Sequence, residues 1–293
     1  MKEKIRKIIF VIALITFIIS IGILGWYYYN KYKREQDINL LKELVVDSGE
    51  ISPTIANNDD DTNNVNDNIQ NGLDYYIIDG QIVQKKFKDI YLKNTDFIGW
   101  LNLSNSNIDY PVVYTPNDVQ YYLRKDFDKN YSIAGTLFIG DDTDIEKPSE
   151  NVIIYGHNMN DNTMFHDISN FEDEKYYQKH KYIEFDTLTR SGKYEVIAAF
   201  RTTVNMTPQY DGFNVYTSVN MNNEQFDKFV DNCLKNTPYK TVNNVDYDEK
   251  LITLSTCAYH NTYGRFVVIA KLIEETKVDT SKPPIQTINT KQE

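Results

Sequence analysis

The sequence predicts a mainly β domain with helices, of the α+β class, behind an apolar N-terminal segment. Short runs rich in β-branched and aromatic residues recur along the chain, and most are bounded by Gly, Pro, Asn or Asp, which is typical of a barrel or a sandwich. Apolar residues at helical spacing interrupt these runs. Eight runs are predicted as strands: 99–104, 108–114, 135–140, 151–157, 182–188, 193–204, 250–257 and 265–275. Four stretches are predicted as helical: 84–94, 118–127, 171–180 and the longer 222–236.

An uncharged apolar run covers 8–29 and is long enough to cross a bilayer. It closes on Trp26 and three tyrosines, and aromatic side chains prefer the headgroup layer of a membrane. Four basic residues in the segment 1–7 precede it, so the positive-inside rule predicts a cytoplasmic N-terminus and an extracellular position for the rest of the chain. A cleaved signal peptide is the alternative, which the length of the run and its aromatic end disfavour.

The stretch 30–72, between the apolar run and the β domain, has little to bury. Its first part has apolar residues at helical spacing and predicts a short amphipathic stalk. Its second part, 49–72, is rich in Asn and Asp and predicts a disordered linker. The globular domain is predicted at 73–275, and 276–293 is predicted to be a flexible, frayed tail.

The charge of the chain is divided between these parts. Residues 1–34 hold seven of the 31 Lys and Arg residues and one of the 42 acidic residues, so the remainder has a net charge of −17. A domain this acidic cannot bind nucleic acid through phosphate neutralisation and counterion release. The sequence therefore excludes a nucleic-acid partner.

The 293 residues include two cysteines, Cys233 and Cys257. Cys233 lies on the apolar face of the predicted helix 222–236, so the simplest interpretation is a small buried side chain. Cysteines outside the membrane often pair, and a Cys233–Cys257 disulfide is the alternative. In that disulfide, Cys257 would have no free thiol to act as a nucleophile.

Cys257 ends one predicted strand, and Arg265 opens the next, eight residues later. His157 ends the apolar run NVIIYGH and is followed by a polar loop, where functional groups often lie. His260, three residues after Cys257, competes for the role of the histidine but lies in a loop that does not fix its ring. Three unrelated residues at strand ends remain an alternative interpretation of His157, Cys257 and Arg265. No spacing of His, Cys or acidic residues matches a metal site, and no phosphate, nucleotide or flavin motif occurs, so no cofactor is predicted.

If these three side chains converge, their types specify a mechanism. A cysteine thiolate attacks an acyl carbon. A histidine protonates the departing amine and later takes a proton from an incoming one. An arginine, which is always charged, stabilises the oxyanion or holds the substrate backbone.

The chain resembles a class B sortase, a membrane-anchored cysteine transpeptidase of Gram-positive bacteria. The resemblance covers nearly the whole domain, and its most specific element is Thr-Leu-Ser-Thr-Cys followed after eight residues by an Arg-led β run, with Tyr-Gly-His upstream. The matching stretches are FIGWLNLSNSNIDYPVV, YYLRKDFDKNYSIAGTLFIGDD, NVIIYGHNM and LITLSTCAYHNTYGRFVVIAKL.

The resemblance implies an eight-stranded sortase β-barrel, with an N-terminal helix and a long helix before the strand that carries Cys257. It implies that Cys257 is the nucleophile, His157 the general acid and base, and Arg265 the cation that binds the oxyanion or the substrate. It further implies substrate contacts from three residues: Tyr155, Ser255 and, in the groove wall, Leu123.

The resemblance also implies the reaction. A C-terminal sorting signal, NPQTN-like or of the related type (N/S/P)-P-x-T-(N/G), is cleaved after Thr. A peptidoglycan precursor or crossbridge amine then accepts the acyl group, which leaves a surface protein bound to the cell wall. Two alternatives stay open: a cysteine endopeptidase that hydrolyses the same signal, and a non-catalytic anchored binding module.

Overall fold

The computed structural model describes residues 2–46, 72–140, 143, 151–204, 215–241, 245–247, 249–257 and 264–290. The chain divides into two compact units, Met1–Leu44 and Val45–Glu293. The first unit is formed by helix α1 (Lys2–Val46), whose segment Glu3–Val45 is long and apolar enough to cross a membrane by length and composition. The helix continues past the predicted span 8–29 into the predicted stalk, while most of the predicted linker lies outside the described residues.

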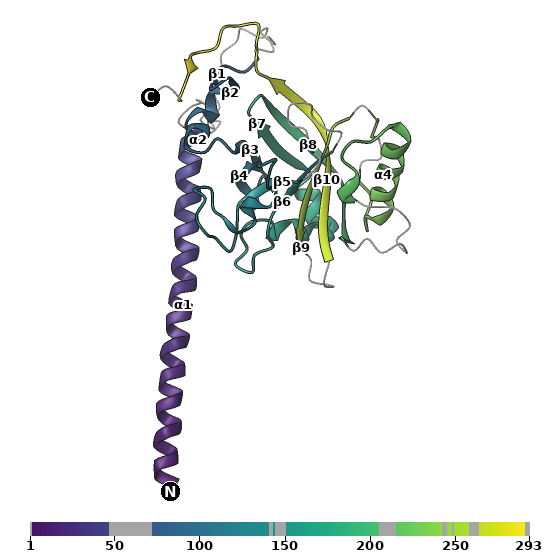
Figure 1. Cartoon of the computed structure of the whole chain (residues 1–293). Coiled ribbons are helices and arrows are strands. Elements are labelled where there is room, and N and C mark those ends of the chain that lie inside the picture. Colours follow the sequence, from purple (N-terminus) through teal and green to yellow (C-terminus); the bar gives the residue numbers. More distant parts are fainter. Residues whose placement is uncertain are drawn as a thin grey trace, which may run out of the picture. The chain divides into compact units, whose positions relative to one another are not determined.

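The second unit contains a closed barrel of eight strands among its described residues (Figure 1). Around the barrel the strands follow the order β10-β8-β7-β3-β4-β5-β6-β9, so both the barrel and the strand number agree with the sequence prediction. Their bounds are β3 Phe97–Asn102, β4 Asp109–Val113, β5 Leu137–Ile139, β6 Asn151–Tyr155, β7 Tyr182–Thr187, β8 Arg190–Thr203, β9 Leu251–Cys257 and β10 Gly264–Lys277.

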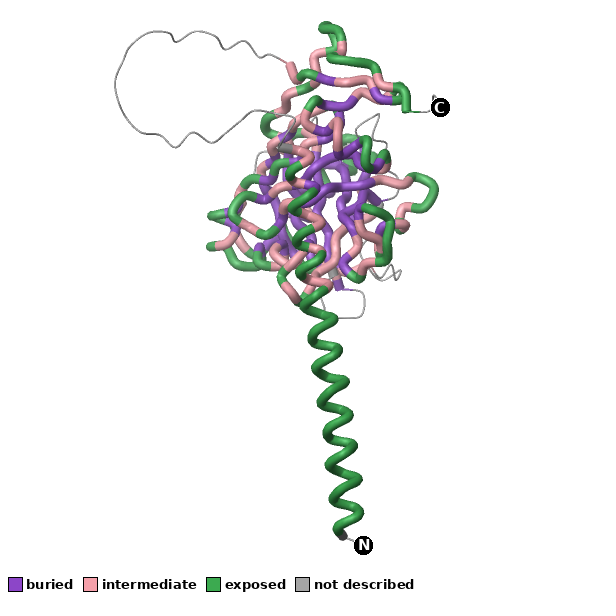
Figure 2. Tube along the Cα trace, turned by 90° about the vertical axis from the view of Figure 1, so that its left-hand side faces the viewer, coloured by how far each residue is buried: buried purple, intermediate pink, exposed green. Residues whose placement is uncertain are grey.

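The core lies within the second unit, where much of the tube in Figure 2 is buried, and strands of the barrel supply many of its side chains. Leu101 on β3 and Ile154 on β6 are fully buried, and so is Val267 on β10, which belongs to the apolar cluster beneath helix α4 (Asn223–Asn236). Such β-branched and aliphatic side chains fit a pleated, closed sheet, which explains why the apolar runs of the sequence became strands.

Helix α4 (Asn223–Asn236) is the long helix predicted before β9. It begins at a capping box, in which the Asn222 side chain accepts from the backbone of Gln225 and the Gln225 side chain accepts from the backbone of Asn222. Its apolar face packs with barrel residues of β8, β9 and β10 and includes Cys233, a free thiol. Burial raises the pKa of Cys233 well above its usual value, which makes the thiol inert and supports the interpretation of a structural residue.

The other predicted helices are shorter than expected or broken. The stretch 84–94 forms the 3₁₀ helix η1 (Lys85–Phe87) and helix α2 (Lys88–Lys93), and 171–180 overlaps η3 (His166–Glu172) and α3 (Glu174–Lys179). The prediction of a helix over 118–127 is wrong beyond one turn, because only η2 (Tyr121–Arg124) forms there. A further 3₁₀ turn, η4 (Val215–Thr217), precedes α4.

The described part of the C-terminal segment returns to the domain, although the sequence predicts a frayed tail. Strand β10 extends to Lys277, and β11 (Thr287–Ile288) then pairs in parallel with β1 (Tyr75–Ile78). With β2 (Gln81–Gln84), these strands form a separate three-stranded sheet, β11-β1-β2. A two-residue strand has no detectable periodicity, so the pattern of the sequence did not reveal it.

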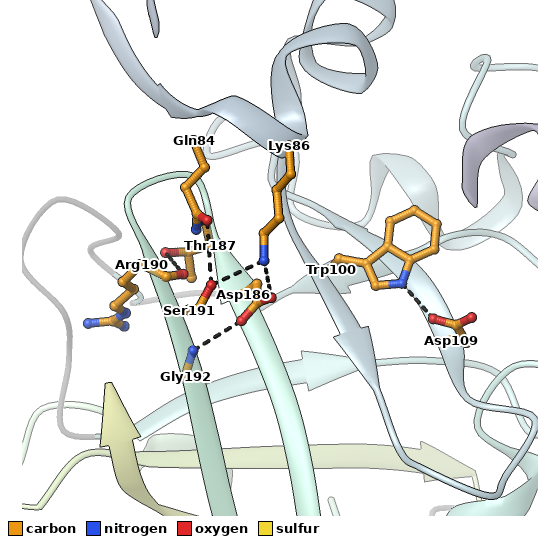
Figure 3. A network of polar contacts seen from close by, with 9 residues as sticks. All are labelled: Gln84, Lys86, Trp100, Asp109, Asp186, Thr187, Arg190, Ser191 and Gly192. Atoms are coloured by element: carbon orange, nitrogen blue, oxygen red, sulfur yellow. Dashed lines mark hydrogen bonds and ion pairs between the residues drawn. The ribbon is translucent and has the colours of Figure 1, made fainter. Parts of the chain in front are cut away.

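Polar side chains attach this small sheet to the β7–β8 hairpin of the barrel (Figure 3). The ammonium group of Lys86 pairs with Asp186 and donates to Ser191 Oγ at 3.1 Å. Asp186 also accepts from the backbone nitrogen of Gly192 at 3.1 Å, and Gln84 donates its side-chain amide to the Thr187 carbonyl at 2.5 Å. The lead-in to the barrel is therefore held by specific contacts at the end of β7.

Candidate active site

Strand pairing brings the ends of β6, β9 and β10 together at one end of the barrel. Strands β6 and β9 run parallel, with Tyr155 opposite Ser255. Strands β9 and β10 run antiparallel, with Arg265 opposite Cys257. The backbones of the predicted nucleophile and the predicted cation are therefore direct neighbours, and β6 delivers His157 beside them.

Two hydrogen bonds fix the relation between the His157 and Cys257 segments. The backbone nitrogen of Gly156 donates to the Ser255 carbonyl at 3.1 Å. The hydroxyl of Thr256, which is buried, donates to the Gly156 carbonyl at 2.7 Å. The residue before His157 is thus bonded to the residue before Cys257.

Gly156 is required at this crossing by close packing. A Cβ at this position would lie 2.5 Å from a methyl carbon of Leu137 and 2.6 Å from the ring of Phe165, both shorter than any normal contact. The absence of a side chain lets the chain turn out of β6 directly over the core. A side chain at position 156 would therefore have to displace Leu137 or Phe165, directly before His157.

His157 is half-buried, and its Nε2 lies 2.8 Å from the carbonyl oxygen of Leu123 in η2. Burial lowers the pKa of His157 below its usual 6.5; the hydrogen bond to Leu123 raises it, and the nearby charge of Arg124 lowers it. Loss of the aqueous environment disfavours the imidazolium, which explains the direction of the change. Leu123, expected as a groove wall, contacts the histidine through its main chain.

The loop after His157 is ordered by its own contacts. The backbone nitrogen of Phe165 donates to the His157 carbonyl at 2.9 Å, and Asn158 forms an isolated β-bridge with Met164. The ring of His166 lies 2.9 Å from the Asn158 side-chain oxygen, through Nδ1. His166 thus contacts the loop that follows His157.

Arg265 is half-buried and donates from Nη1 to its own neighbour, the Gly264 carbonyl, at 2.9 Å. One nitrogen of the guanidinium is thereby held against the start of β10. The side chain of Cys257 and the whole segment 258–263, which includes the competing His260, lie outside the described residues. Strand register places the backbones of Cys257 and Arg265 opposite each other.

Tyr155 and Ser255, the predicted substrate contacts, belong to an aromatic cluster beside these strand ends. Tyr155 is half-buried and stacks on Phe138 at 5.5 Å and on Tyr216 at 6.0 Å between ring centroids. The Tyr216 hydroxyl and Ser255 Oγ are 2.9 Å apart, and Ser255 is 1% exposed. Sequence analysis missed Tyr216, since nothing in its local pattern indicates that η4 folds onto β6 and β9.

No group of three or more His, Cys, Asp or Glu side chains within the described ranges is arranged to hold a metal ion. The chemistry derived below uses thiol, imidazole and guanidinium groups.

The sequence matches the sortase domain model over residues 101–273, which is more than half of the chain. It is 32% identical over 197 residues to sortase B of Staphylococcus aureus, covering 66% of this chain and 76% of that protein. It is 28% identical over 193 residues to sortase B of Listeria monocytogenes, covering 65% and 75% of the two chains.

Solved structures agree with these sequence matches. The crystal structure of Staphylococcus aureus sortase B superposes with a TM-score of 0.58 at 31% identity, covering 67% of this chain and 89% of the other. A Staphylococcus aureus sortase B–substrate complex gives 0.58 at 30%, covering 67% and 87%. At 23% identity, sortase B of B. anthracis shares the fold, with a TM-score of 0.65 over 84% and 99% of the two chains. From the barrel, the domain match and these relatives, we conclude that this chain belongs to the sortase family of cysteine transpeptidases, in its class B.

Proposed function

We propose that this enzyme cleaves a C-terminal sorting signal after Thr and transfers the new acyl group to a peptidoglycan amine, which anchors a surface protein to the cell wall. The observation that carries the proposal is the register of β9 against β10, which pairs Cys257 with Arg265. The bonds between Gly156 and the Ser255–Thr256 segment bring His157 to the same strand ends.

In the first half of the reaction, the Cys257 thiolate attacks the carbonyl carbon of the substrate Thr. Arg265 stabilises the negative charge on the carbonyl oxygen, since one side of its guanidinium is already held by Gly264. The imidazolium of His157 gives its proton to the departing amine as the C–N bond breaks, and a thioacyl enzyme remains.

In the second half, the acceptor amine attacks the thioester carbon. His157, now neutral, takes a proton from the amine as the new C–N bond forms, and the C–S bond breaks to release the thiolate. The enzyme returns to its starting protonation state. Water in place of the amine would give hydrolysis by the same steps.

The proposed signal is NPQTN-like or of the type (N/S/P)-P-x-T-(N/G). A related sortase B has been solved with a substrate bound, which supports a substrate groove at the corresponding place here. Tyr155, Ser255 and Leu123 are proposed to contact the substrate. Ser255 is buried and lies within hydrogen-bond distance of the Tyr216 hydroxyl. A substrate can therefore touch Ser255 only if the Tyr216 ring moves; otherwise the substrate touches Tyr216, which in turn contacts Ser255.

We propose that α1 anchors the enzyme as a single-pass protein, with 1–7 in the cytoplasm, 8–29 in the membrane and the catalytic domain 73–275 outside the cell on the linker 30–72. The apolar helix and the basic residues before its core support this arrangement. A signal sequence is the alternative, because it passes the same test of hydropathy, but the length of the run 8–29 and its aromatic end disfavour it.

The test uses the full chain in detergent with quenched peptides that cover the (N/S/P)-P-x-T-(N/G) pattern. Products are followed by mass spectrometry with and without added amine acceptors. Cleavage after Thr that is diverted to an amide product by amine supports transpeptidation. Cleavage that gives only the acid product at every amine concentration would favour hydrolysis.

Two cysteine variants serve as a matched pair in this assay. Cys257→Ala should abolish cleavage, because it removes the nucleophile. Cys233→Ala should retain it, because Cys233 is a buried free thiol of α4 that the proposed reaction does not use. Full cleavage by Cys257→Ala would reject the proposed site.

A further inference from the structure

The 3₁₀ turn η2 is fastened from one side by the segment 132–136. The backbone nitrogen of Thr136 donates to the Tyr122 carbonyl at 3.1 Å, and the backbone nitrogen of Ser132 donates to the Arg124 carbonyl at 2.9 Å. The Thr136 hydroxyl adds a bond to the Lys125 carbonyl at 3.0 Å. The directions of successive carbonyl groups in η2 are therefore set by this segment.

Between the fastened carbonyls of Tyr122 and Arg124 lies that of Leu123, which faces the ring of His157. A carbonyl oxygen only accepts hydrogen bonds, so the 2.8 Å contact requires a proton on Nε2 of His157. In the neutral imidazole this leaves Nδ1 without a proton. Nδ1 is then the nitrogen that exchanges protons during a reaction.

Gly135 lies where the segment 132–136 approaches η2 most closely. Its φ of +62° is in the left-handed region. A Cβ at this position would lie 2.7 Å from the carbonyl oxygens of both Leu123 and Tyr122, and main-chain atoms cannot move aside as a flexible side chain can. A side chain at 135 therefore forces main-chain atoms to shift, and the Leu123 carbonyl that contacts His157 is one of the two carbonyls in its way.

We propose that Gly135 is a positioning residue of the transpeptidation reaction: by lacking a side chain, it holds the Leu123 carbonyl on Nε2 of His157. The inference rests on the proposed role of His157. In the first half-reaction, the proton passes from Nδ1 to the departing amine; in the second, Nδ1 takes a proton from the attacking amine. The Nε2–H bond to Leu123 persists through both steps and keeps the ring in one orientation.

The first test replaces Gly135 in the full chain, in detergent. Gly135→Ala introduces the collision, and Gly135→Asn introduces it in a residue that tolerates positive φ. Gly80→Ala is the matched control, because Gly80 also has positive φ, +89°, but a Cβ there meets nothing within 4 Å. The control should keep the wild-type kcat/KM profile.

Both Gly135 variants should lower kcat/KM and shift the His157 limb of its pH profile to lower pH. The hydrogen bond to Leu123 raises the pKa of His157, so its loss lowers that pKa. We expect a shift of this limb to lower pH and a fall of kcat/KM of about tenfold. A merely structural defect would lower the amount of folded enzyme without moving the limb, so an unshifted limb in folded Gly135→Ala and Gly135→Asn would overturn the proposal.

The second test reads the proton directly and does not depend on activity. Histidine side chains of the full chain are labelled with ¹⁵N, and His157 is assigned by comparison with His157→Gln. At a pH above the pKa of His157, the wild-type protein should show the Nε2–H tautomer. This result does not require the Gly135 variants to fold. A proton on Nδ1 would overturn the inference.

The two tests separate this inference from the proposed function. If His157→Gln cleaves peptides at the wild-type rate, the proposed role of His157 fails whatever its tautomer. If His157→Gln is inactive but His157 carries its proton on Nδ1, the proposed function stands and the role of Gly135 is rejected.

Discussion

Protonation of His157 is opposed by burial, which outweighs the hydrogen bond to Leu123 and lowers its pKa below 6.5. The proposed reaction needs a proton on His157 and a deprotonated Cys257, so kcat/KM should follow a bell-shaped pH profile. Because the histidine pKa is lowered, the His157 limb should lie below pH 6.5, and the maximum should lie between it and the thiol limb. Measuring kcat/KM from pH 5 to 10 tests this, and a flat profile would contradict the assignment of acid and nucleophile.

Arg265 and Lys differ in the number of donors that they can place at the oxyanion. One guanidinium nitrogen of Arg265 donates to the Gly264 carbonyl, and a guanidinium has further N–H donors in a fixed planar arrangement, which an ammonium group cannot reproduce. Arg265→Lys should lower kcat/KM by about 100-fold despite the unchanged charge, as for the loss of an oxyanion donor. Arg201→Lys is the control, because the Arg201–Glu172 pair is exposed and should contribute little. Equal effects of the two substitutions would refute a specific role for Arg265.

At the scale of elements, two threonine hydroxyls of β9 bond to the β6 segment, and we expect their removal to affect stability alike but activity differently. Thr256→Val removes the bond from the Thr256 hydroxyl to the Gly156 carbonyl, next to both His157 and Cys257. Thr253→Val removes a similar buried bond, 2.9 Å to the Asn151 side chain, earlier on the same strand.

Each threonine substitution should lower the free energy of unfolding by about 1 kcal/mol. Only Thr256→Val should also lower kcat, because it loosens the segment that positions the site. Urea unfolding and steady-state kinetics of both variants provide the comparison. A loss of kcat in Thr253→Val as large as in Thr256→Val would show that the effect is general to β9.

The elements also show what sequence patterns could predict. Long runs such as 193–204 and 265–275 became β8 and β10, because their β-branched and aromatic side chains have no better arrangement than a buried sheet. The stretch 118–127 was predicted as a helix and forms only η2, since its polar groups bond to the segment 132–136 instead of continuing a helix. Such contacts depend on tertiary structure, which local spacing does not encode.

In the candidate site, too, local patterns predicted some features, while others depend on tertiary contacts. His157, Cys257 and Arg265 were chosen from residue type and strand-end position, and the strand register brings their backbones together. The sequence did not reveal that the Leu123 carbonyl contacts His157 or that Tyr216 contacts Ser255. A main-chain carbonyl has no sequence signature, and Tyr216 reaches Ser255 across 39 residues of chain.

At the scale of the whole molecule, we expect removal of the C-terminal segment to lower the stability of the protein without changing its activity. Its backbone exchanges hydrogen bonds with β1, among them Ile77 N to Gln286 O at 3.1 Å and Ile285 N to Tyr75 O at 2.8 Å. Deletion of 278–293 should lower the free energy of unfolding by about 2 kcal/mol, as expected for a few partly exposed hydrogen bonds.

The same deletion should leave kcat/KM at 25 °C unchanged, because the small sheet contributes no residue to the proposed site. Deletion of 291–293 alone removes none of these bonds and serves as the control. Thermal unfolding and peptide cleavage measure the two effects. Loss of cleavage in a folded 278–293 deletion would place the C-terminal segment in the catalytic machinery.

Strand β9 lies between β6 and β10 in the closed barrel, and it pairs with β6 across 100 residues of chain, as in Asn151 with Leu251. Contacts of such long sequence separation form late in folding, because a large loop must close before they are gained. During synthesis, His157 emerges well before Cys257, and the barrel cannot close until β9 is inserted. The proposed site is therefore complete only after β9 and β10 have been synthesised and paired, and a nascent chain that ends before Cys257 lacks the nucleophile with which to attack a neighbouring peptide.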